Sequence, residues 1–425
     1  MGPGGFPPAG LWKGEETMLY IIGGKVITME GSVWEKGYVC IRDGKIAELG
    51  PMEGKAPVSG RSEVSSGKKG GPEVIDASGC IVMPGLIEAH CHMGITEEKK
   101  GMEGDDCNET VDPLTPYLRA VDAVNPMDAA FDDAVRAGIT SAMIGPGSSN
   151  VAGGSFVFVK THGRCIDRLI VKNPAAMKVA FGENPKVNYS GQGKSPSTRM
   201  AIAAMLREEL FKAVQYKEKR ENGMKPQERD FRYECWLPVL SGEIPLKAHV
   251  HRADDILTAI RIAREFHLDM TLDHCSEGHL IAEEVARSGF PAIVGPDLAS
   301  RNKIEVQNMA FKTVGILNQK GVKTAITTDH PVSLIQSLPV CAGLAVKAGM
   351  DREEALRSIT IYPAQICRVE DRVGSLKVGK DADIVIFDGD PLEIATKAMC
   401  TLIQGEVAYC DEGFRGCKGS TFCNA

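Results

Sequence analysis

The sequence lacks the patterns that identify a membrane protein, a nucleotide-binding protein or a nucleic-acid-binding protein. No apolar run approaches the length of about eighteen residues that a membrane-spanning helix requires. Neither a GxxxxGKS/T motif nor a GxGxxG motif occurs, so the Gly-rich segment 145–154 is not interpreted as a phosphate-binding loop. The formal net charge is −7 and there is no basic block, which argues against nucleic acid as the main partner. We therefore expect a small-molecule substrate, with neither a membrane nor a nucleic acid as partner.

Thirteen cysteines are present, but the patterns of an exported, disulfide-bonded protein are missing. There is no CxxC pair, no dense short framework of cysteines and no signal-peptide pattern. We therefore expect reduced thiols and a cytoplasmic location, and the expected assembly is a homo-oligomer. Cys410, Cys417 and Cys423 have spacings typical of neither a zinc ribbon nor a helix face, so residues 411–425 are predicted to be a surface tail.

The ends of the chain differ from its centre in pattern. Residues 1–17 are rich in Gly and Pro and lack periodicity, which predicts a disordered tail. From residue 18, short apolar stretches separated by turn residues predict a small β domain, in which residues 53–73 form a polar, mobile loop. A β pattern returns at 384–387.

After residue 92, strand-like segments alternate with helix-length amphipathic segments, which predicts parallel βαβ units and a barrel. The expected helices are 126–137, 197–220, 253–267, 280–288, 306–320 and one that begins near 351. The expected strands are 140–144, 156–159, 177–181, 246–249, 270–274, 292–294 and 324–327. The predicted fold class is α/β: a (β/α)8 TIM barrel at 84–367, with a β-sandwich built from 18–83 together with 368–410.

The apolar run 81–89 is followed directly by His90, Cys91 and His92. On a strand, alternate residues share a face, so the imidazoles of His90 and His92 lie close enough to bind one metal ion. An isolated pair of this kind is more often two hydrogen-bonded histidines of a buried strand. Here, further candidates follow other apolar runs: His249, His251, His274, His279 and Asp329. Imidazoles and a carboxylate at several strand ends predict a metal site at one mouth of a parallel barrel.

These features resemble those of the metal-dependent amidohydrolases with a urease-like composite architecture. The segment PGLIEAHCH at 84–92 resembles the first barrel strand of that family, and VGSLKVGKDADIV at 373–385 resembles its return into the β domain. The resemblance covers residues 18–400. Within the superfamily it is greatest to proteins related to imidazolonepropionase and to relatives among the dipeptidases, through the Gly-rich segment 145–163 and the barrel spacing.

The resemblance implies a set of metal ligands. In the family, the two histidines of the first strand bind the more buried metal, histidines of the fifth and sixth strands bind the other, and an aspartate of the eighth strand binds metal and moves protons. The matching residues are His90, His92, His249, His274 and Asp329. His251 shares a strand face with His249 and is the alternative ligand; otherwise it faces the substrate. His279 lies beyond the strand end, where contact with substrate and a plain loop position both stay open.

Two residues are candidates for the ligand that bridges the metals. Lys178 lies in a segment that resembles the fourth strand, whose lysine is carboxylated in urease and dihydropyrimidinase. Burial of a lysine favours the free amine, which is the form that adds carbon dioxide. Glu183 could bridge directly, as a glutamate does in other branches, but it lies where the strand turns into a loop. We favour Lys178, with Glu183 then contacting substrate or supporting the ligands.

The resemblance implies one or two divalent ions per subunit, zinc in preference to iron or manganese, and hydrolysis of an amide C–N bond. Water activated by the metal is the nucleophile, and Asp329 moves its proton to the leaving nitrogen. The expected substrate is a cyclic amide, an N-acyl compound or a dipeptide.

Lys160, Arg164, Lys186 and Arg199 are candidates for binding a substrate carboxylate, although a solvated surface position is the simpler interpretation of each. Imidazolonepropionase or a related deaminase is the alternative activity. A noncatalytic scaffold that has kept the fold is the alternative from another class.

Overall fold

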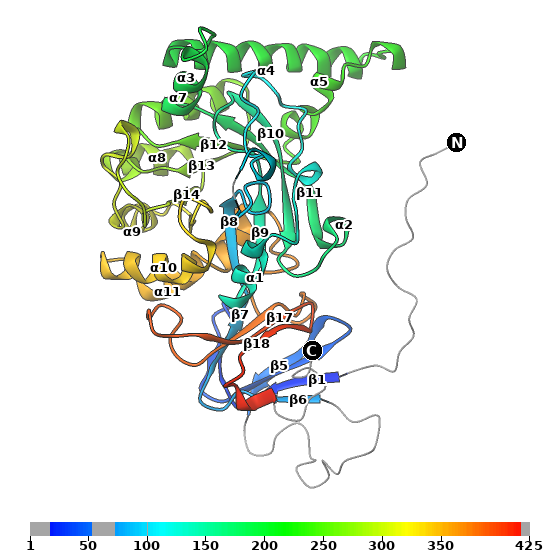
Figure 1. Ribbon diagram of the computed structural model, residues 1–425, viewed down its shortest axis with the longest axis vertical. Helices are drawn as coiled ribbons and strands as arrows, with labels where there is room; N and C mark the ends of the chain where they lie inside the picture. Colours follow the sequence, from blue (N-terminus) through cyan, green and yellow to red (C-terminus); the bar gives the residue numbers. More distant parts are fainter. Residues whose placement is uncertain (1–17, 53–72, 100, 418–425) are drawn as a thin grey trace.

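The computed structural model describes residues 18–52, 73–99 and 101–417. The predicted tail at 1–17 lies outside the described residues, as do the predicted loop apart from Glu73 and the part of the predicted C-terminal tail beyond residue 417. Figure 1 shows a large sheet wrapped by helices in the upper part of the molecule and smaller sheets, built by both ends of the chain, in the lower part.

The large sheet is a nearly closed barrel of eight strands, whose spatial order follows their order in the chain. The strands are β8 (Leu86–Cys91), β9 (Ile139–Ile144), β10 (Ala152–Lys160), β11 (Ile170–Ala180), β12 (Leu246–Val250), β13 (Met270–His274), β14 (Ala292–Val294) and β15 (Thr324–Ile326). At the seam between β15 and β8, the Thr327 hydroxyl donates to the His90 carbonyl at 2.7 Å, and the His92 N–H donates to the His330 carbonyl at 2.8 Å. The first and last strands therefore meet at the end of the barrel that carries the predicted ligands.

One strand runs against the expected direction. β10 pairs antiparallel with both β9 and β11, whereas the other neighbouring strands of this sheet pair parallel. The uniform parallel repeat expected for a (β/α)8 barrel is therefore wrong at β10. The reason is the short connection: residues 145–151 join β9 to β10, and a parallel crossover needs about a dozen residues or more. β10 also begins at Ala152, inside the Gly-rich segment 145–154.

Helices cover the outside of the barrel (Figure 1). The α-helices are α1 (Ala129–Arg136), α2 (Ile166–Leu169), α3 (Glu183–Ser190), α4 (Arg199–Glu221), α5 (Phe231–Glu234), α6 (Leu237–Leu240), α7 (Ala253–Glu265), α8 (Ala282–Ser288), α9 (Lys312–Gln319), α10 (Leu338–Lys347), α11 (Arg352–Arg357) and α12 (Ile361–Ile366). Short 3-10 helices are η1 (Met102–Gly104), η2 (Ala120–Asp122), η3 (Pro226–Glu228), η4 (Gly278–Ile281), η5 (Ile304–Val306), η6 (Ile335–Ser337) and η7 (Arg415–Cys417). In the described part of the chain, no helix combines the length and the apolar composition needed to cross a membrane. The helix expected at 306–320 is divided between η5 and α9, and α10 was not expected.

Both ends of the chain contribute to two smaller sheets. One has the order β5 (Lys45–Pro51), β4 (Gly37–Arg42), β1 (Met18–Ile22) and β6 (Glu73–Asp76). The other has the order β18 (Glu406–Cys410), β17 (Ala398–Ile403), β16 (Ile384–Phe387), β7 (Ile81–Pro84), β2 (Lys25–Ile27) and β3 (Val33–Trp34). One hydrophobic cluster contains buried residues of both sheets, among them Ile21 and Ile41 of the first and Val82 and Ile386 of the second. A small β domain is thus present, and its boundaries stay a prediction.

The segment 411–417 is only partly at the surface: Glu412, Gly413 and Arg415 are exposed. Phe414 and Cys417 are buried and belong to the hydrophobic cluster of the small sheets. The prediction of a surface tail missed these two buried residues, because the spacing of cysteines within one segment says nothing about the strands against which the segment packs.

Buried ion pairs join the barrel to the small sheets. Lys160, at the end of β10, is 2% exposed, and its Nζ lies 2.7 Å from Asp383 Oδ2 and 3.0 Å from Asp381 Oδ2. Both aspartates precede β16. Burial raises the pKa of the Asp381 carboxyl, but Lys160 and other cations outweigh it and lower that pKa. Lys160 therefore binds carboxylates of its own chain, which removes it as a candidate for binding a substrate carboxylate.

We predict that Lys160→Met lowers the free energy of unfolding by about 3–5 kcal/mol, because it leaves the buried carboxylate of Asp383 without its cation, whereas Asp381 keeps Lys45 and Arg372. Lys25→Met is the control, since the Lys25–Glu35 pair is solvent-exposed and such pairs contribute at most about 1 kcal/mol. Urea unfolding followed by circular dichroism measures both. If the urea concentration at the midpoint of unfolding is as high for Lys160→Met as for the control, the role of Lys160 at the junction is contradicted.

Candidate metal centre

Three predicted ligands form a first triad at the seam of the barrel. His90 lies in β8, His92 follows that strand, and Asp329 follows β15 in a left-handed backbone conformation with φ of 51°. Asp329 Oδ1 lies 3.2 Å from His92 Nε2 and 3.6 Å from His90 Nε2. One ligand atom of each residue lies within 4.8 Å of the others, so the triad can hold one metal ion.

Three histidines form a second triad beside the first. His249 is the penultimate residue of β12, and His251 follows that strand directly. His274 is the last residue of β13. Their ligand atoms also lie within 4.8 Å of one another. The geometry thus places the preferred ligand His249 and its alternative His251 in the same group. The rings of His90 and His274 have centroids 4.9 Å apart, so the two triads adjoin.

The hydrogen bonds of the histidines leave nitrogen atoms available for a metal. His92 Nδ1 lies 2.7 Å from the Gly145 carbonyl and His274 Nδ1 lies 2.8 Å from the Gly295 carbonyl, which leaves Nε2 of each ring as the electron-pair donor. His251 Nδ1 bonds Ser276 Oγ at 2.8 Å.

The buried atoms that have no hydrogen-bond partner among the described residues include His249 Nδ1 and Asp329 Oδ1. A nitrogen and a carboxylate oxygen left without partners in a buried site are suited to binding a divalent cation.

The electrostatic environment keeps most of these imidazoles neutral. Burial lowers the pKa of His274 well below its usual range, and the neighbouring His249 adds to the effect. Burial also lowers the pKa of His251 and of His90, and for His90 the second cause is Lys178. Because only the neutral ring donates an electron pair, these three rings are prepared to bind a metal rather than a proton. His92 differs: burial lowers its pKa, but Cys107 and Asp329 outweigh burial and raise that pKa to about 10.

Lys178 lies where the triads meet. It is fully buried in β11, and its Nζ lies 3.2 Å from His90 Nε2. Burial lowers its pKa to about 8, against the opposing effect of Asp273. Glu183 begins α3, and among the described residues its carboxylate has no hydrogen bond or ion pair with either triad; its N–H donates to Glu305 Oε2. His279 is half-buried and bonds Thr313 at 2.9 Å, outside both triads.

Beneath the first triad lies a charged layer that the sequence analysis did not identify. Asp273 Oδ2 lies 2.6 Å from His90 Nδ1 and 3.0 Å from Lys247 Nζ, and all three side chains are buried. Glu88 accepts hydrogen bonds from the hydroxyls of Thr327 and Thr328. Side chains alternate between the two faces of a strand, so Glu88 shares a face with His90 and His92, and Lys247 shares a face with His249 and His251. This alternation could have indicated Glu88 and Lys247 from the sequence.

A second group that the sequence analysis missed surrounds His249. Glu305 is 1% exposed, and its Oε1 lies 3.8 Å from Nε2 of both His249 and His251. Asn184 Nδ2 lies 3.4 Å from His249 Nε2. Neither residue follows a predicted strand directly, so no local pattern indicated them.

A cavity of about 630 Å³ opens beside the triads. Cys107 belongs to its lining and neighbours His92, and Gly153 lies against the Lys178 side chain. The cavity is large enough for a small ligand. Its carboxylates are Asp105, Asp106, Glu109 and Asp122, and its arginine, Arg119, pairs with Asp122 at 2.7 Å.

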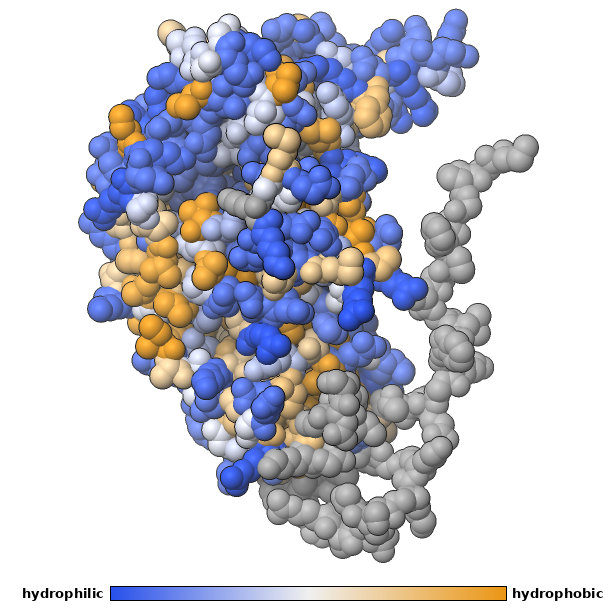
Figure 2. All heavy atoms as spheres, in the orientation of Figure 1, coloured by the Kyte–Doolittle hydropathy of each residue, from blue (hydrophilic) through white to orange (hydrophobic). Residues whose placement is uncertain are grey.

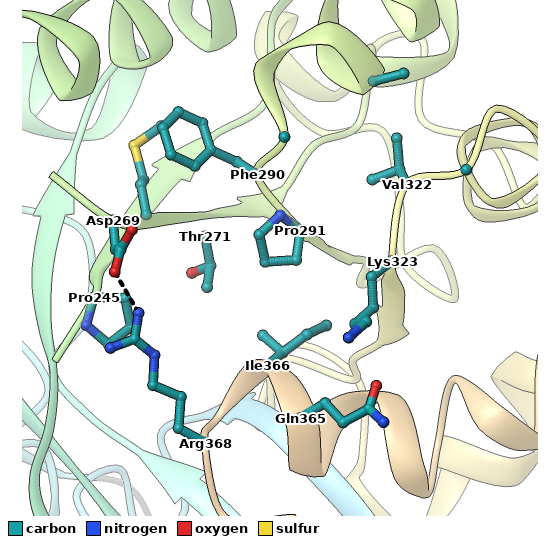
Figure 3. Close-up of a pocket in the computed structure, with 14 residues that line it drawn as sticks. Pro245, Asp269, Thr271, Phe290, Pro291, Val322, Lys323, Gln365, Ile366 and Arg368 are labelled. Atoms are coloured by element: carbon teal, nitrogen blue, oxygen red, sulfur yellow. Dashed lines mark hydrogen bonds and ion pairs between the residues drawn. The ribbon is translucent and has the colours of Figure 1, made fainter. Parts of the chain in front are cut away.

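A cavity of about 300 Å³ lies at the opposite end of the barrel, near the beginnings of β13, β14 and β15 (Figure 3). Figure 3 shows Arg368 paired with Asp269 at its edge, at 2.7 Å. No predicted ligand lines this cavity or the larger one, but the lining of the larger one includes Cys107, which neighbours His92. Because catalytic groups of parallel barrels lie at the carboxyl ends of the strands, we place the candidate site at the triads.

The chain is similar to known proteins over most of its length. Residues 240–408 match the model of the amidohydrolase family. The crystal structure of an amidohydrolase from Thermotoga maritima superposes with a TM-score of 0.86 and 35% sequence identity, covering 92% of this chain and 100% of that one.

Two curated relatives are also similar. The amidohydrolase tasK of Hapsidospora irregularis is 27% identical over 417 residues; the match covers 90% of this chain but only 41% of that protein. An imidazolonepropionase from Brevibacillus brevis is 38% identical over 109 residues, which is 25% of this chain and 24% of that protein.

We predict that Asp273→Asn weakens metal binding by about 10- to 100-fold, because the carboxylate that orients His90 and makes it more basic is lost. Asp269→Asn is the control, since Asp269 lies at the other end of β13. Metal dissociation constants measured with a competing chelator test this, with melting temperature as the check on folding. Equal constants for the two variants contradict the role of Asp273 as a positioning residue.

Proposed function

The chain belongs to the amidohydrolase family, a superfamily of metal-dependent hydrolases that act on C–N bonds, and we propose that it hydrolyses an amide bond in a small-molecule substrate. One observation carries the proposal: two adjoining groups of buried ligand atoms share an edge at which Asp329 presents an unpartnered carboxylate oxygen. The expected substrates remain cyclic amides, N-acyl compounds and dipeptides.

The proposed ligands are His90, His92, His249, His274 and Asp329, and His251 stays the alternative to His249. The set of nitrogen and oxygen donors suits zinc, iron or manganese, and we prefer zinc. When bound, such ions polarise a substrate carbonyl and lower the pKa of water into the neutral range. Buried walls around the triads exclude bulk water, which strengthens the electrostatic interactions inside.

Asp329 has the position of a proton carrier. Its Oδ1 faces the Nε2 atoms of His90 and His92, at the edge where the attacking water must lie. We propose that this oxygen accepts the proton of the water as it attacks the carbonyl carbon and then donates it to the leaving nitrogen. A carboxylic acid and an amine are the products.

The bridging ligand is proposed to be Lys178. The position of its Nζ beside His90 Nε2 supports this choice, whereas Glu183 lies beyond the end of β11. Carbamate formation joins the neutral amine to carbon dioxide and releases one proton, which gives an oxygen ligand on a long arm. Glu183 and His279 are then left with supporting or substrate-contacting roles, as is His251 if it is not a ligand.

The lining of the large cavity supports a preference among substrates. Four carboxylates and one paired arginine form its charged groups, and the rings of Tyr117 and Phe231 have centroids 6.2 Å apart at its edge. Arg199 pairs with Asp255 at 3.0 Å, so it too binds a carboxylate of its own chain. We therefore expect neutral or basic substrates to be preferred over acidic ones.

The experiment that tests the function is a substrate screen with metal-reconstituted protein. Hydantoins, lactams, N-acyl amino acids and dipeptides represent the proposed class. 4-Imidazolone-5-propionate and aminopurines represent the alternatives, imidazolonepropionase and deaminase. Release of ammonia without release of a carboxylate would favour a deaminase. Absence of stoichiometric zinc, iron and manganese from the purified protein would favour the noncatalytic scaffold.

The domain division is also a proposal. We assign 84–367 to the hydrolase barrel and 18–83 with 368–410 to the small β domain, as the strand orders of the sheets support. A homo-oligomer remains our expectation for the assembly.

We predict that Lys178→Ala loses bound metal and that Glu183→Ala keeps it, because only Lys178 reaches the junction of the triads. Bicarbonate should accelerate reconstitution of the wild-type protein. Elemental analysis of both variants and metal uptake with and without bicarbonate test the assignment. If Lys178→Ala keeps both metals, bicarbonate has no effect and Glu183→Ala loses one metal, the bridge is Glu183.

We predict that Asp329→Asn lowers kcat by about two orders of magnitude or more, because asparagine keeps the size of the side chain but loses its basicity. Steady-state kinetics with the best substrate of the screen measures the effect. Metal content and melting temperature separate lost proton transfer from lost metal or lost folding. Turnover near the wild-type value would assign the proton transfer to another residue.

A further inference from the structure

Three cysteines of the small β domain meet at one point. Cys400, Cys410 and Cys417, which we call the C-terminal thiol cluster, place their sulfur atoms within 4.8 Å of one another. Cys400 lies in β17, Cys410 ends β18 and Cys417 belongs to η7. Figure 1 shows β17 and β18 in the lower part of the molecule, away from β12 and β13, which carry histidines of the metal centre. The cluster is therefore a separate site.

The first two thiols are brought together by a β-hairpin. β17 and β18 are joined by Gln404 and Gly405, both with positive φ, of 50° and 78°. Such a two-residue turn sets the register of the strands next to it, and an irregularity between Thr401 and Leu402 then shifts that register, so that Cys400 lies directly opposite Cys410. Residues opposite each other in an antiparallel pair have neighbouring side chains, so this contact follows from the hairpin.

The third thiol, that of Cys417, lies near the other two because the backbone at Gly416 packs closely against the backbone of β6. After β18, the Phe414 N–H donates to the Asp411 carbonyl at 2.9 Å, which turns the chain back over the sheets. A Cβ on Gly416 would lie only 2.2 Å from the Asp76 carbonyl oxygen of β6. Only glycine fits there, and it allows the next residue, Cys417, to reach the hairpin.

The surroundings distinguish the cluster from cysteines that merely fill a core. Cys400 and Cys417 are at most 1% exposed, whereas Cys410 is half-buried and leaves one side open to solvent. Hydrogen bonding to Cys410 and Cys417 raises the pKa of the Cys400 thiol well above its usual range. Three anionic sulfurs cannot lie so close together without a cation, while a bound cation would make them ligands. Among the described residues, no other three cysteines meet in this way.

We propose that the C-terminal thiol cluster binds one thiophilic divalent cation of the zinc type, as a structural site that holds the C-terminal segment to the small sheets. Three thiolates form one face of a tetrahedron, and the half-buried side at Cys410 leaves the fourth position accessible to a further ligand. On binding, each thiol that coordinates the ion releases its proton to solvent, so no oxidant or reductant is needed.

Elemental analysis of purified full-length protein tests the proposal. We expect Cys410→Ser and Cys417→Ser to contain about one zinc ion fewer per chain than the wild type. Cys40→Ser is the matched control, because Cys40 is 2% exposed in β4 of the same small domain and is not part of the cluster. The readout is independent of catalysis, so it stands whatever the substrate screen finds. Equal zinc contents in the four proteins would overturn the proposal.

Cobalt substitution shows whether sulfur coordinates the ion. Cobalt-loaded wild type should have thiolate-to-cobalt charge-transfer absorption in the near ultraviolet, and the absorption should be lost in Cys410→Ser. It should persist in Cys107→Ser, the variant that removes the thiol beside His92. Absorption that disappears only in Cys107→Ser would overturn the assignment.

Thiol labelling of wild type covers the case in which a serine variant fails to fold. Under native conditions, the cluster thiols should be protected from alkylation when zinc is present and should react after its removal. Mass spectrometry that finds a disulfide between Cys400 and Cys410 would overturn the proposal, because a disulfide leaves too few thiolates for the site.

Discussion

The site depends on a layer of charged groups inside the barrel, several of which pair with one another. Lys178, Lys247 and Asp273 are all at most 1% exposed, and an isolated charge in such surroundings costs several kcal/mol. Asp273 offsets this cost by facing Lys247 and the His90 ring together, while Glu88 accepts four hydrogen bonds from nearby hydroxyls and N–H groups. The layer holds His90 in one orientation and leaves its outer nitrogen directed at the mouth of the barrel.

Strand direction and backbone conformation then bring the ligands together. The parallel strands β8, β12, β13 and β15 all end at the same mouth, so short side chains from distant parts of the sequence meet there. His274 and Asp329 have φ of 72° and 51°, a conformation unusual for residues other than glycine. Such strain persists where the surroundings hold the residue firmly, and it turns both side chains toward the junction of the triads. The reversal of β10 adds the connection 145–151, whose Gly145 carbonyl orients His92.

The small β domain contributes at the other end of the molecule. Lys160 connects the barrel to the carboxylates that precede β16, and Asp383 also accepts a hydrogen bond from the Gln404 N–H in the turn of the β17–β18 hairpin. The same hairpin presents Cys400 and Cys410. The β17–β18 hairpin therefore contacts the junction with the barrel and also carries two residues of the thiol cluster.

The local pattern of the sequence determined the alternation of strands and helices, the pair formed by His90 and His92, and the strand ends that carry His249, His274 and Asp329. These are properties of short segments, because periodicity sets which face a side chain occupies. The tertiary structure alone decided that β10 runs antiparallel, that Lys178 rather than Glu183 lies beside His90, and that Asp273, Glu305 and Asn184 surround the ligands. It also decided that Cys400 meets Cys410 and Cys417. Each of these results depends on which strands become neighbours, and neighbouring strands are chosen by the packing of the whole chain and not by any single segment.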